Sequence, residues 1–239
     1  DEVRKLLRAA KNPLLITANG GRTSEGARAL TQFAERWAMP VVHYRPRYLA
    51  MSTEHPLAAG WEPHAALKTA DVVIVVECDV PWIPVQGGPR DDAKIVHIGA
   101  DPLFTRYPLR GFRTDIALTG LVAPTLNALA DRAPEAATLK ARYDSTVKAC
   151  EALRASQRSG CDTIPKTLTT KYVTACLNKL INAKCGEDAL FVNEYPLVLE
   201  EMQIRTPGRY FGSAPAGGLG WGLGAAVGAK LAEIGRAHV

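Results

Sequence analysis

The fold of this chain is constrained most by one short apolar run, which reads Asp-Val-Val-Ile-Val-Val-Glu over residues 71–77. A continuous run of β-branched residues of this length is typical of a strand that is buried on both faces of a parallel sheet. Similar runs lie at 13–17, 40–44, 94–98 and 115–118. The sequence therefore predicts a buried parallel sheet that is built from these runs.

Helical patterns separate the predicted strands. From 24 to 37, apolar residues recur on one face at helical spacing, and either Thr23 or Ser24 is suited to cap the first turn. Shorter helices are predicted over 63–69 and 121–129. Strands that alternate with helices in this way predict a parallel sheet with right-handed crossovers, which is a doubly wound α/β fold of Rossmann-like type.

Changes of composition divide the chain into segments. Residues 1–130 carry the alternating pattern and are predicted to form one α/β domain. Residues 131–164 are rich in Ala, Lys and Arg and poor in large apolar side chains, which is typical of an exposed helical linker. Residues 165–232 predict the start of a second α/β domain, with a helix over 168–181 and a buried strand over 188–193.

Charge and cysteine content argue against several classes of protein. The 29 basic and 24 acidic side chains give a formal net charge of +5, but they are interspersed and form no concentrated patch for nucleic acid. No apolar run is long enough to span a membrane. The 5 cysteines form no CxxC pair, which argues against a disulfide framework or a zinc site and favours a reducing, cytoplasmic compartment.

A glycine-rich stretch over 217–228 is the main candidate for a ligand contact. It contains a G-x-G-x-x-A spacing, but no strand directly precedes it, so a dinucleotide site lacks its required context. Small residues recur at every fourth position from Gly220 to Ala232, beside an apolar stripe that begins at Leu219. This pattern predicts a buried, closely packed helix, preceded by a glycine turn that offers backbone groups to a ligand.

Two further positions are candidates for ligand contact. The turn Ala18-Asn19-Gly20-Gly21-Arg22 joins a strand to a helix, where it either approaches a phosphate or serves only as a tight turn. Glu194 follows the predicted strand at the sheet edge where α/β domains bind ligands, although a surface acid would look the same in sequence. The histidines have no metal-ligand spacing, and no Ser–His–Asp or Cys–His set is evident.

Several sequence blocks occur in an order that is typical of one enzyme family. Residues 211–232 contain Gly-Gly-Leu-Gly, an aromatic residue and then Gly-Leu-Gly-Ala-Ala-Val-Gly-Ala-Lys-Leu-Ala. Further matching blocks lie at 12–16, 55–57, 70–76, 101–103, 191–194 and 205–210. Together they resemble the thiamine-diphosphate-dependent enzymes of the acetolactate synthase type and their relative benzoylformate decarboxylase. The resemblance implies a DHS-like middle domain over 1–130, followed by the opening of the diphosphate-binding domain.

The resemblance also implies a set of cofactor-binding residues. The carbonyl of Gly217 would face the aminopyrimidine ring of thiamine diphosphate, and Leu219 would support the bend of the cofactor. Gly218, Gly220 and Glu194 complete the implied set. A thiamine cofactor would act as an electron sink for the decarboxylation of a 2-keto acid.

Other features of the family are expected to lie outside this chain or to be altered in it. The activating glutamate belongs to an N-terminal domain and a Gly-Asp-Gly metal motif follows the glycine helix, so no catalytic residue and no Mg²⁺ ligand are predicted here. Residues 195–197 read Tyr-Pro-Leu where relatives place hydroxyl side chains on the diphosphate. Residues 78–84 resemble the acetolactate synthase-like branch but replace an arginine-rich turn, which argues against FAD. We therefore expect an inactive fragment, with a non-native tail over 233–239.

Three functions follow as hypotheses. The first is a fragment of a decarboxylase or carboligase that converts pyruvate to acetolactate. The second is a benzoylformate decarboxylase-like lyase. The third, from a different class, is a non-catalytic nucleotide-binding, flavin-binding or structural module. For the complete enzyme the family implies thiamine diphosphate and Mg²⁺ as cofactors, a small 2-keto acid as substrate, a homodimer or homotetramer, and neither nucleic acid nor membrane as partner.

Overall fold

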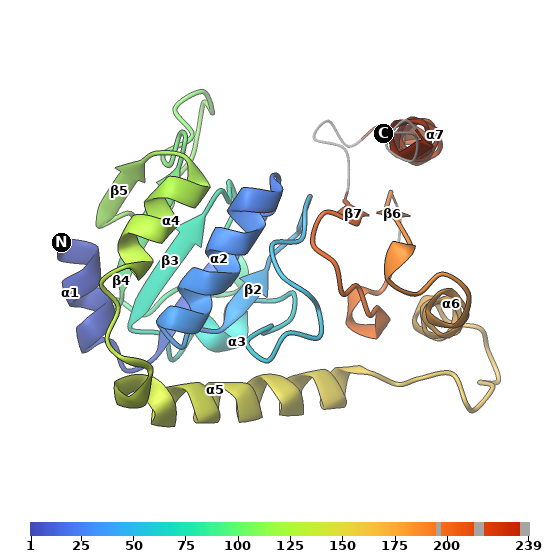
Figure 1. The fold of residues 1–239 in the computed structure, drawn as a ribbon, viewed down its shortest axis with the longest axis horizontal. Helices are drawn as coiled ribbons and strands as arrows, with labels where there is room; N and C mark the ends of the chain where they lie inside the picture. Colours follow the sequence, from blue (N-terminus) through green and yellow to red (C-terminus); the bar gives the residue numbers. More distant parts are fainter. Residues whose placement is uncertain (195–196, 213–217, 235–239) are drawn as a thin grey trace.

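The structure is a computed structural model of the chain, and it describes residues 1–194, 197–212 and 218–234. Its largest part is a five-stranded sheet in the order β2-β1-β3-β4-β5, in which every neighbouring pair runs parallel (Figure 1). The strands are β1 (Pro13–Thr17), β2 (Val41–His43), β3 (Val72–Val76), β4 (Lys94–Gly99) and β5 (Ile116–Thr119). Each coincides with a predicted run to within one residue at either end, so the predicted parallel sheet is confirmed.

The two faces of the sheet carry separate apolar cores. Alternate residues of β3 divide between them, with Val72, Ile74 and Val76 in one core and Val73 and Val75 in the other. Because both faces are buried, β3 has an apolar residue at every position, as its sequence predicts. Strand β5 differs, because among the described residues it pairs on one side only, and its residues are alternately half-buried and exposed.

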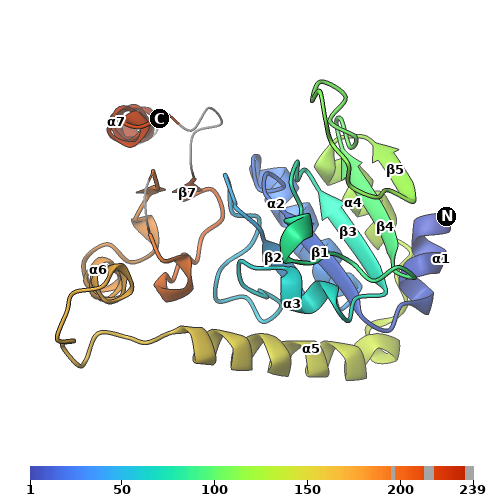
Figure 2. The ribbon, with the colours of Figure 1, turned by 180° about the vertical axis from the view of Figure 1, so that it is seen from behind.

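Helices cover the sheet unequally. One face packs against α1 (Glu2–Ala9), α2 (Ser24–Arg36) and α4 (Val122–Ala130). The other face, seen in Figure 2, packs against the short α3 (His64–Leu67) and the loop that leads into the 3₁₀ turn η1 (Pro84–Gln86). The doubly wound arrangement is therefore present, with one thick and one thin helical layer.

The start of α2 shows how the local sequence fixes a helix boundary. The Thr23 hydroxyl accepts a hydrogen bond from the backbone N–H of Gly26 at 3.0 Å, so the cap is Thr23 and not Ser24. Glu25 lies in the first turn, where its charge complements the helix dipole. The predicted helix boundary is thereby confirmed at its amino end.

The long helix α5 (Ala136–Gln157) lies along the edge of the sheet at which the strands begin (Figure 1). Two arginines attach it. Arg142 donates to the carbonyl oxygens of Ala10 and Trp37, and Arg154 donates to His55 at 2.8 Å and to Ala58 at 3.1 Å. The segment predicted as an exposed linker is therefore bound to the α/β domain through backbone carbonyls of helix ends and of the loop after β2, even though most of its side chains face solvent.

A smaller unit follows α5. It contains α6 (Thr170–Lys184), the parallel strands β6 (Phe191–Val192) and β7 (Tyr210–Phe211), and α7 (Trp221–Ile234). The 3₁₀ turns η2 (Gly186–Asp188) and η3 (Leu199–Glu201) lie between these elements. A separate apolar cluster of Leu49, Met202, Ile204 and Tyr210 joins this unit to the loop that follows β2.

Two expectations for the smaller unit are wrong. The strand predicted over 188–193 is only two residues long and is half-buried, because β7 pairs on one side of β6 and nothing pairs on the other side within the described ranges. The glycine helix was expected to be buried, but Leu223 on its apolar stripe is 79% exposed. In the part of the chain that the structure describes, α7 contacts mainly β6 at its first turn, so its apolar stripe has no packing partner.

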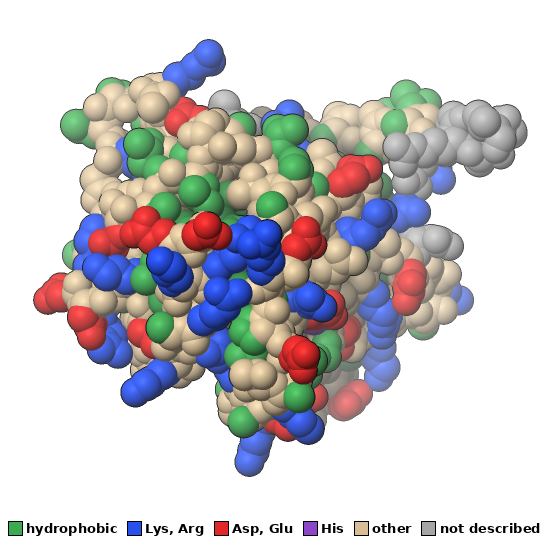
Figure 3. All heavy atoms as spheres, turned by 60° about the vertical axis from the view of Figure 1, so that its left-hand side comes forward, with side chains coloured by type: hydrophobic (Ala, Val, Ile, Leu, Met, Phe, Trp, Pro, Cys, Tyr) green, Lys and Arg blue, Asp and Glu red, His purple; other side chains and the backbone are tan. Residues whose placement is uncertain are grey.

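The surface charges are mixed in sign. Figure 3 shows one face of the molecule, on which blue Lys and Arg side chains alternate with red Asp and Glu side chains. None of the described helices combines the length and the apolar character that crossing a bilayer requires.

Candidate functional site

Strand β6 carries the predicted site toward its carboxyl end. The backbone N–H of Asn193 donates to the carbonyl oxygen of Phe211 at 2.8 Å, which extends the pairing with β7. The Asn193 side chain donates to the Tyr210 hydroxyl at 3.0 Å. Burial raises the pKa of Tyr210, so its hydroxyl stays protonated. These contacts fix the backbone immediately before Glu194.

Glu194 lies at the amino end of α7. Its carboxylate accepts hydrogen bonds from the backbone N–H groups of Gly220 and Gly222, the latter at 2.7 Å. These groups are among the N–H groups that have no partner inside the helix, and the negative charge also complements the helix dipole. Glu194 therefore connects the small sheet to the glycine helix.

Glycine is required at two positions of this contact. A Cβ atom on Gly222 would lie 2.9 Å from a carboxylate oxygen of Glu194, so a larger residue would push the carboxylate away. Gly220 has a φ of +87°, which side-chain-bearing residues rarely adopt. The predicted set of cofactor-binding residues includes Gly220 but not Gly222, although both belong to the G-x-G-x-x-A spacing.

The remaining predicted residues lie on the open side of this turn. Leu219 is 89% exposed, and a Cβ atom on Gly218 would meet nothing within 4 Å. Gly217 lies outside the described residues. The described part of the predicted set, Glu194, Gly218, Leu219 and Gly220, is thus gathered at one turn, and no other element within the described residues encloses it.

A cleft of about 840 Å³ lies beside the turn, between α6, β6 and the start of α7. Its walls include Thr170, Val173 and Leu177 from α6, together with Glu194 and Gly222. The cleft offers an apolar wall, a carboxylate and exposed backbone. These are the kinds of group that a bent aromatic cofactor with a polar edge would contact. The residues fit one side of such a group, and the described part of the chain leaves the other side of the cleft uncovered.

Metal ligands are not gathered at this cleft. Among the residues that the structure describes, no group of three or more His, Cys, Asp or Glu side chains is arranged to hold a metal ion. The Glu194 carboxylate is already occupied by two backbone N–H groups.

The glycine turn after β1 is filled by the chain itself. A Cβ atom on Gly21 would lie 2.1 Å from the carbonyl oxygen of Leu49. The backbone N–H groups of Arg47 and Tyr48 donate to the carbonyl oxygen of Ala18 at 3.0 and 3.3 Å. The loop after β2 thus covers this turn, and its glycines allow close packing of backbone on backbone. The tight-turn interpretation accounts for this motif without a phosphate.

A polar cluster near the carboxyl edge of the sheet surrounds Asp79, within the segment 78–84. The Tyr107 hydroxyl donates to its carboxylate at 2.9 Å, and Arg47 pairs with it at 3.6 Å. Arg110 donates to the Asp79 carbonyl and also contacts Nδ1 of His97 at 3.2 Å. Burial, and secondly the Arg110 charge, lower the pKa of His97 to about 4. The charged groups of the cluster are paired with one another, while Nε2 of His97 is buried without a hydrogen-bond partner among the described residues. The sequence alone does not identify the cluster, because its members are scattered along the chain.

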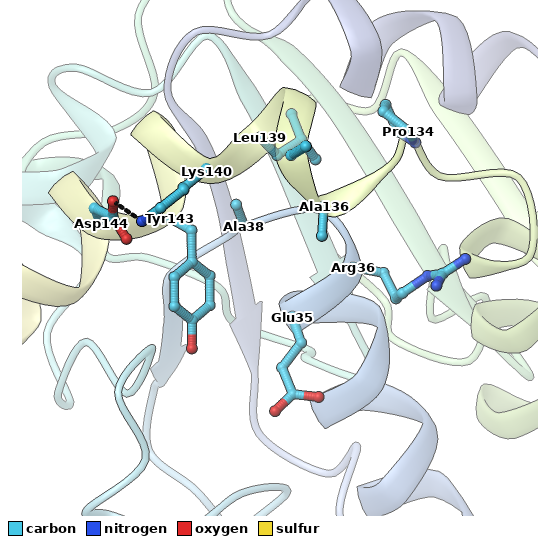
Figure 4. Close-up of a pocket in the computed structure, with 10 residues that line it drawn as sticks. Glu35, Arg36, Ala38, Pro134, Ala136, Leu139, Lys140, Tyr143 and Asp144 are labelled. Carbon is cyan, nitrogen blue, oxygen red and sulfur yellow. Dashed lines mark hydrogen bonds and ion pairs between the residues drawn. The ribbon is translucent and has the colours of Figure 1, made fainter.

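Another cavity, of about 530 Å³, lies between the end of α2 and the start of α5 (Figure 4). Its carboxylates already have partners. Asp144 pairs with Lys140 at 2.6 Å, and Glu35 pairs with His55 at 3.2 Å. The cavity therefore offers an apolar gap bounded by satisfied charges and supports no specific chemistry.

Comparison with known proteins agrees with this fold. Residues 1–129 match the family model of the thiamine pyrophosphate enzyme central domain. Benzoylformate decarboxylase from Pseudomonas aeruginosa strain PAO1 is 30% identical over an alignment of 252 residues in length, which covers 97% of this chain and 43% of that protein. Oxalyl-CoA decarboxylase from Escherichia coli K12 is 28% identical over 99 residues, covering 41% of this chain and 18% of that protein. The chain thus spans less than half the length of the curated relatives it matches.

Solved structures show the same fold at lower identity. Benzoylformate decarboxylase from Polynucleobacter necessarius superimposes with a TM-score of 0.73 at 21% identity, over 99% of this chain and 43% of that one. A 4-hydroxybenzoylformate decarboxylase from Rhodococcus jostii RHA1 gives a TM-score of 0.67 at 23% identity, over 97% of this chain and 43% of that one. The sheet order and the match over 1–129 agree, and the chain belongs to the family of thiamine pyrophosphate enzymes.

Proposed function

We propose that this chain is part of a thiamine-diphosphate-dependent 2-keto acid decarboxylase of the benzoylformate decarboxylase type. The observation that carries the proposal is the 30% identity to benzoylformate decarboxylase, which extends over 97% of the chain and includes both the central domain and the glycine helix. The proposal therefore takes a lyase that acts on an aryl-substituted 2-keto acid in preference to the acetolactate synthase hypothesis.

Each described site residue has a role in this proposal. Leu219 supports the bend of the cofactor with its exposed side chain, while Gly218 and Gly220 leave room for backbone contact. Glu194 positions the turn by capping α7. Thiamine diphosphate, when bound, supplies the electron sink for the loss of carbon dioxide. Mg²⁺, the activating glutamate and a second subunit would come from outside the described residues. The domain limits 1–130, 131–164 and 165–232, the oligomeric state and a cytoplasmic location stay predictions.

One observation favours a second candidate. Residues 78–84 resemble the acetolactate synthase-like branch, which would join two pyruvate molecules instead of releasing an aldehyde. The two reactions differ in substrate and in product, so they can be separated directly.

The test uses the protein encoded by the complete open reading frame, loaded with thiamine diphosphate and Mg²⁺. We expect benzoylformate to be converted to benzaldehyde and carbon dioxide, with pyruvate turned over more slowly. Efficient formation of acetolactate would support the second candidate, and the absence of turnover with either 2-keto acid would refute both.

A matched pair of variants tests the role of Leu219. Leu219→Ala should weaken thiamine diphosphate binding about tenfold or more, because it removes an apolar side chain from the cofactor contact. Leu231→Ala changes a residue of the same stripe, three turns farther along α7, and should leave cofactor binding unchanged. Equal cofactor affinity in both variants would contradict the assigned role.

A further inference from the structure

The first half of helix α6 forms one wall of the cleft beside the glycine turn. Thr170, Val173 and Leu177 line the cleft from successive turns of the helix. Thr174 also lines the cleft and is buried. The width of the cleft therefore depends on where the first half of α6 lies.

The segment that enters η3 contacts this half of α6 at one point. The Thr174 hydroxyl accepts a hydrogen bond from the backbone N–H of Val198 at 3.3 Å, directly before η3. The same hydroxyl donates to the carbonyl oxygen of Thr170 at 2.8 Å. A single neutral hydrogen bond of this length is a weak connection, so a stronger contact is needed to fix the helix.

Glu201, the last residue of η3, supplies that contact. Its side chain is buried, and its two oxygens accept from the backbone N–H groups of Ser159 at 2.7 Å and Gly160 at 3.3 Å. The ammonium of Lys171, in the first turn of α6, lies 3.6 Å from the same carboxylate. One buried carboxylate thus joins η3 to the end of the linker and to the start of α6.

The turn η3 is itself fixed to the larger domain. The carbonyl oxygen of Met202 accepts from the Thr53 hydroxyl at 3.2 Å, and the carbonyl oxygen of Glu200 accepts from Nε of Arg158 at 3.4 Å. Met202 also packs with Leu49 in the apolar cluster that joins the two units. A series of contacts therefore runs from the loop after β2 through η3 to the wall of the cleft.

The contacts of Glu201 require a carboxylate. Each of its oxygens faces a different backbone N–H group, and a carboxylate can accept at both oxygens. A glutamine would present its NH₂ group to one of these donors, which would then lose its acceptor, and Lys171 would lose its counter-charge. Removing the charge is therefore expected to release the start of α6 from η3.

We propose that Glu201 is a positioning residue for the thiamine diphosphate cleft, which acts by holding the first turn of α6 through Lys171 and the end of the linker through two backbone N–H groups. The proposal rests on the proposed function, because it takes the cleft to be the cofactor site. Glu201 itself lines a different pocket, so it acts on the cofactor only through the position of α6.

The experiment compares three variants of the protein encoded by the complete open reading frame, in the presence of Mg²⁺. Glu201→Gln removes one acceptor, Glu201→Asp keeps both oxygens, and Glu200→Gln makes the same change at the neighbouring, half-buried residue. We expect the dissociation constant of thiamine diphosphate to rise about tenfold in Glu201→Gln, to rise less in Glu201→Asp and to stay unchanged in Glu200→Gln. At saturating cofactor, kcat for benzoylformate should stay within about twofold of its original value, because Glu201 lies outside the cleft.

Amide hydrogen exchange of residues 170–177 tests the positioning without any cofactor. Exchange in this segment should be faster in Glu201→Gln than in the unchanged protein and in Glu200→Gln, because the start of α6 opens more often once its anchor is lost. Circular dichroism checks that each variant is folded. If Glu201→Gln does not fold, Lys171→Met removes the ammonium alone and should change both measurements in the same direction.

The outcomes separate this proposal from the proposed function. Equal cofactor affinity in Glu201→Gln and Glu200→Gln would overturn the proposal, even if Glu201→Gln unfolds at a lower temperature, because a purely structural role changes stability alone. Unchanged exchange of residues 170–177 would overturn it as well. If the unchanged protein binds no thiamine diphosphate, the proposed function fails, and the exchange of this segment then decides whether Glu201 positions α6.

Discussion

At Gly21, backbone packing leaves no room for a side chain. A methyl group there would meet the carbonyl oxygen of Leu49 at 2.1 Å and the backbone nitrogen of Ala50 at 2.6 Å, and neither atom can move without shifting the loop. We predict that Gly21→Ala lowers the free energy of unfolding by about 3 kcal/mol. Gly111→Ala is the control, since a Cβ atom at Gly111 meets nothing within 4 Å, and it should change the value by less than about 0.5 kcal/mol. Urea denaturation of both variants tests this, and equal stabilities would contradict it.

His43 makes stability depend on pH. It is 3% exposed, its Nε2 accepts a hydrogen bond from the N–H of Ala50 at 3.1 Å, and burial lowers its pKa to about 4. The unfolded chain therefore binds a proton more readily, so the contribution to stability is complete above the unfolded pKa of 6.5 and is lost as the pH falls toward 4. We predict that the free energy of unfolding falls by about 2 kcal/mol through this residue between about pH 7 and about pH 5. His43→Gln, which cannot titrate there, should show a correspondingly smaller fall, and an unchanged slope would exclude His43 as its source.

At the scale of elements, the sheet could be predicted and the smaller unit only in part. Strand β3 is apolar at every position because both its faces are covered, and its helical neighbours have one apolar face each, so local pattern and final packing agree. Helix α7 has the pattern of a buried helix, yet its apolar stripe is exposed, because a pattern records which surface is apolar and not whether a partner is present. The contact of Glu194 with Gly220 and Gly222 joins residues more than twenty positions apart, which no local pattern specifies. Sequence could select the turn and the acid separately, but only the fold shows that one caps the other.

At the scale of the whole molecule, side chains of the loop after β2 connect the large sheet to the smaller unit. The Thr53 hydroxyl accepts from the N–H of Ile204 at 2.9 Å, and Glu54 forms an ion pair with Arg158. Hydrogen bonds from Arg158 and Gln203 lower the pKa of Glu54 against the opposing effect of its burial, which keeps the carboxylate charged. This connection places the candidate site beside the sheet, but it supplies no cover for the cleft.

Because the described residues leave the site uncovered, we predict that the chain of 239 residues has no decarboxylase activity of its own. Leu219 is 89% exposed and the adjoining cleft is open on one side, so water would reach any reacting centre held there. The described residues also bring no free carboxylate to the cleft, because Glu194 is bound to two backbone N–H groups. We expect that the chain, mixed with thiamine diphosphate, Mg²⁺ and either benzoylformate or pyruvate, releases carbon dioxide no faster than the cofactor mixture alone. Release above that background, abolished by Leu219→Ala and retained in Leu231→Ala, would show that one wall of the cleft is sufficient for catalysis.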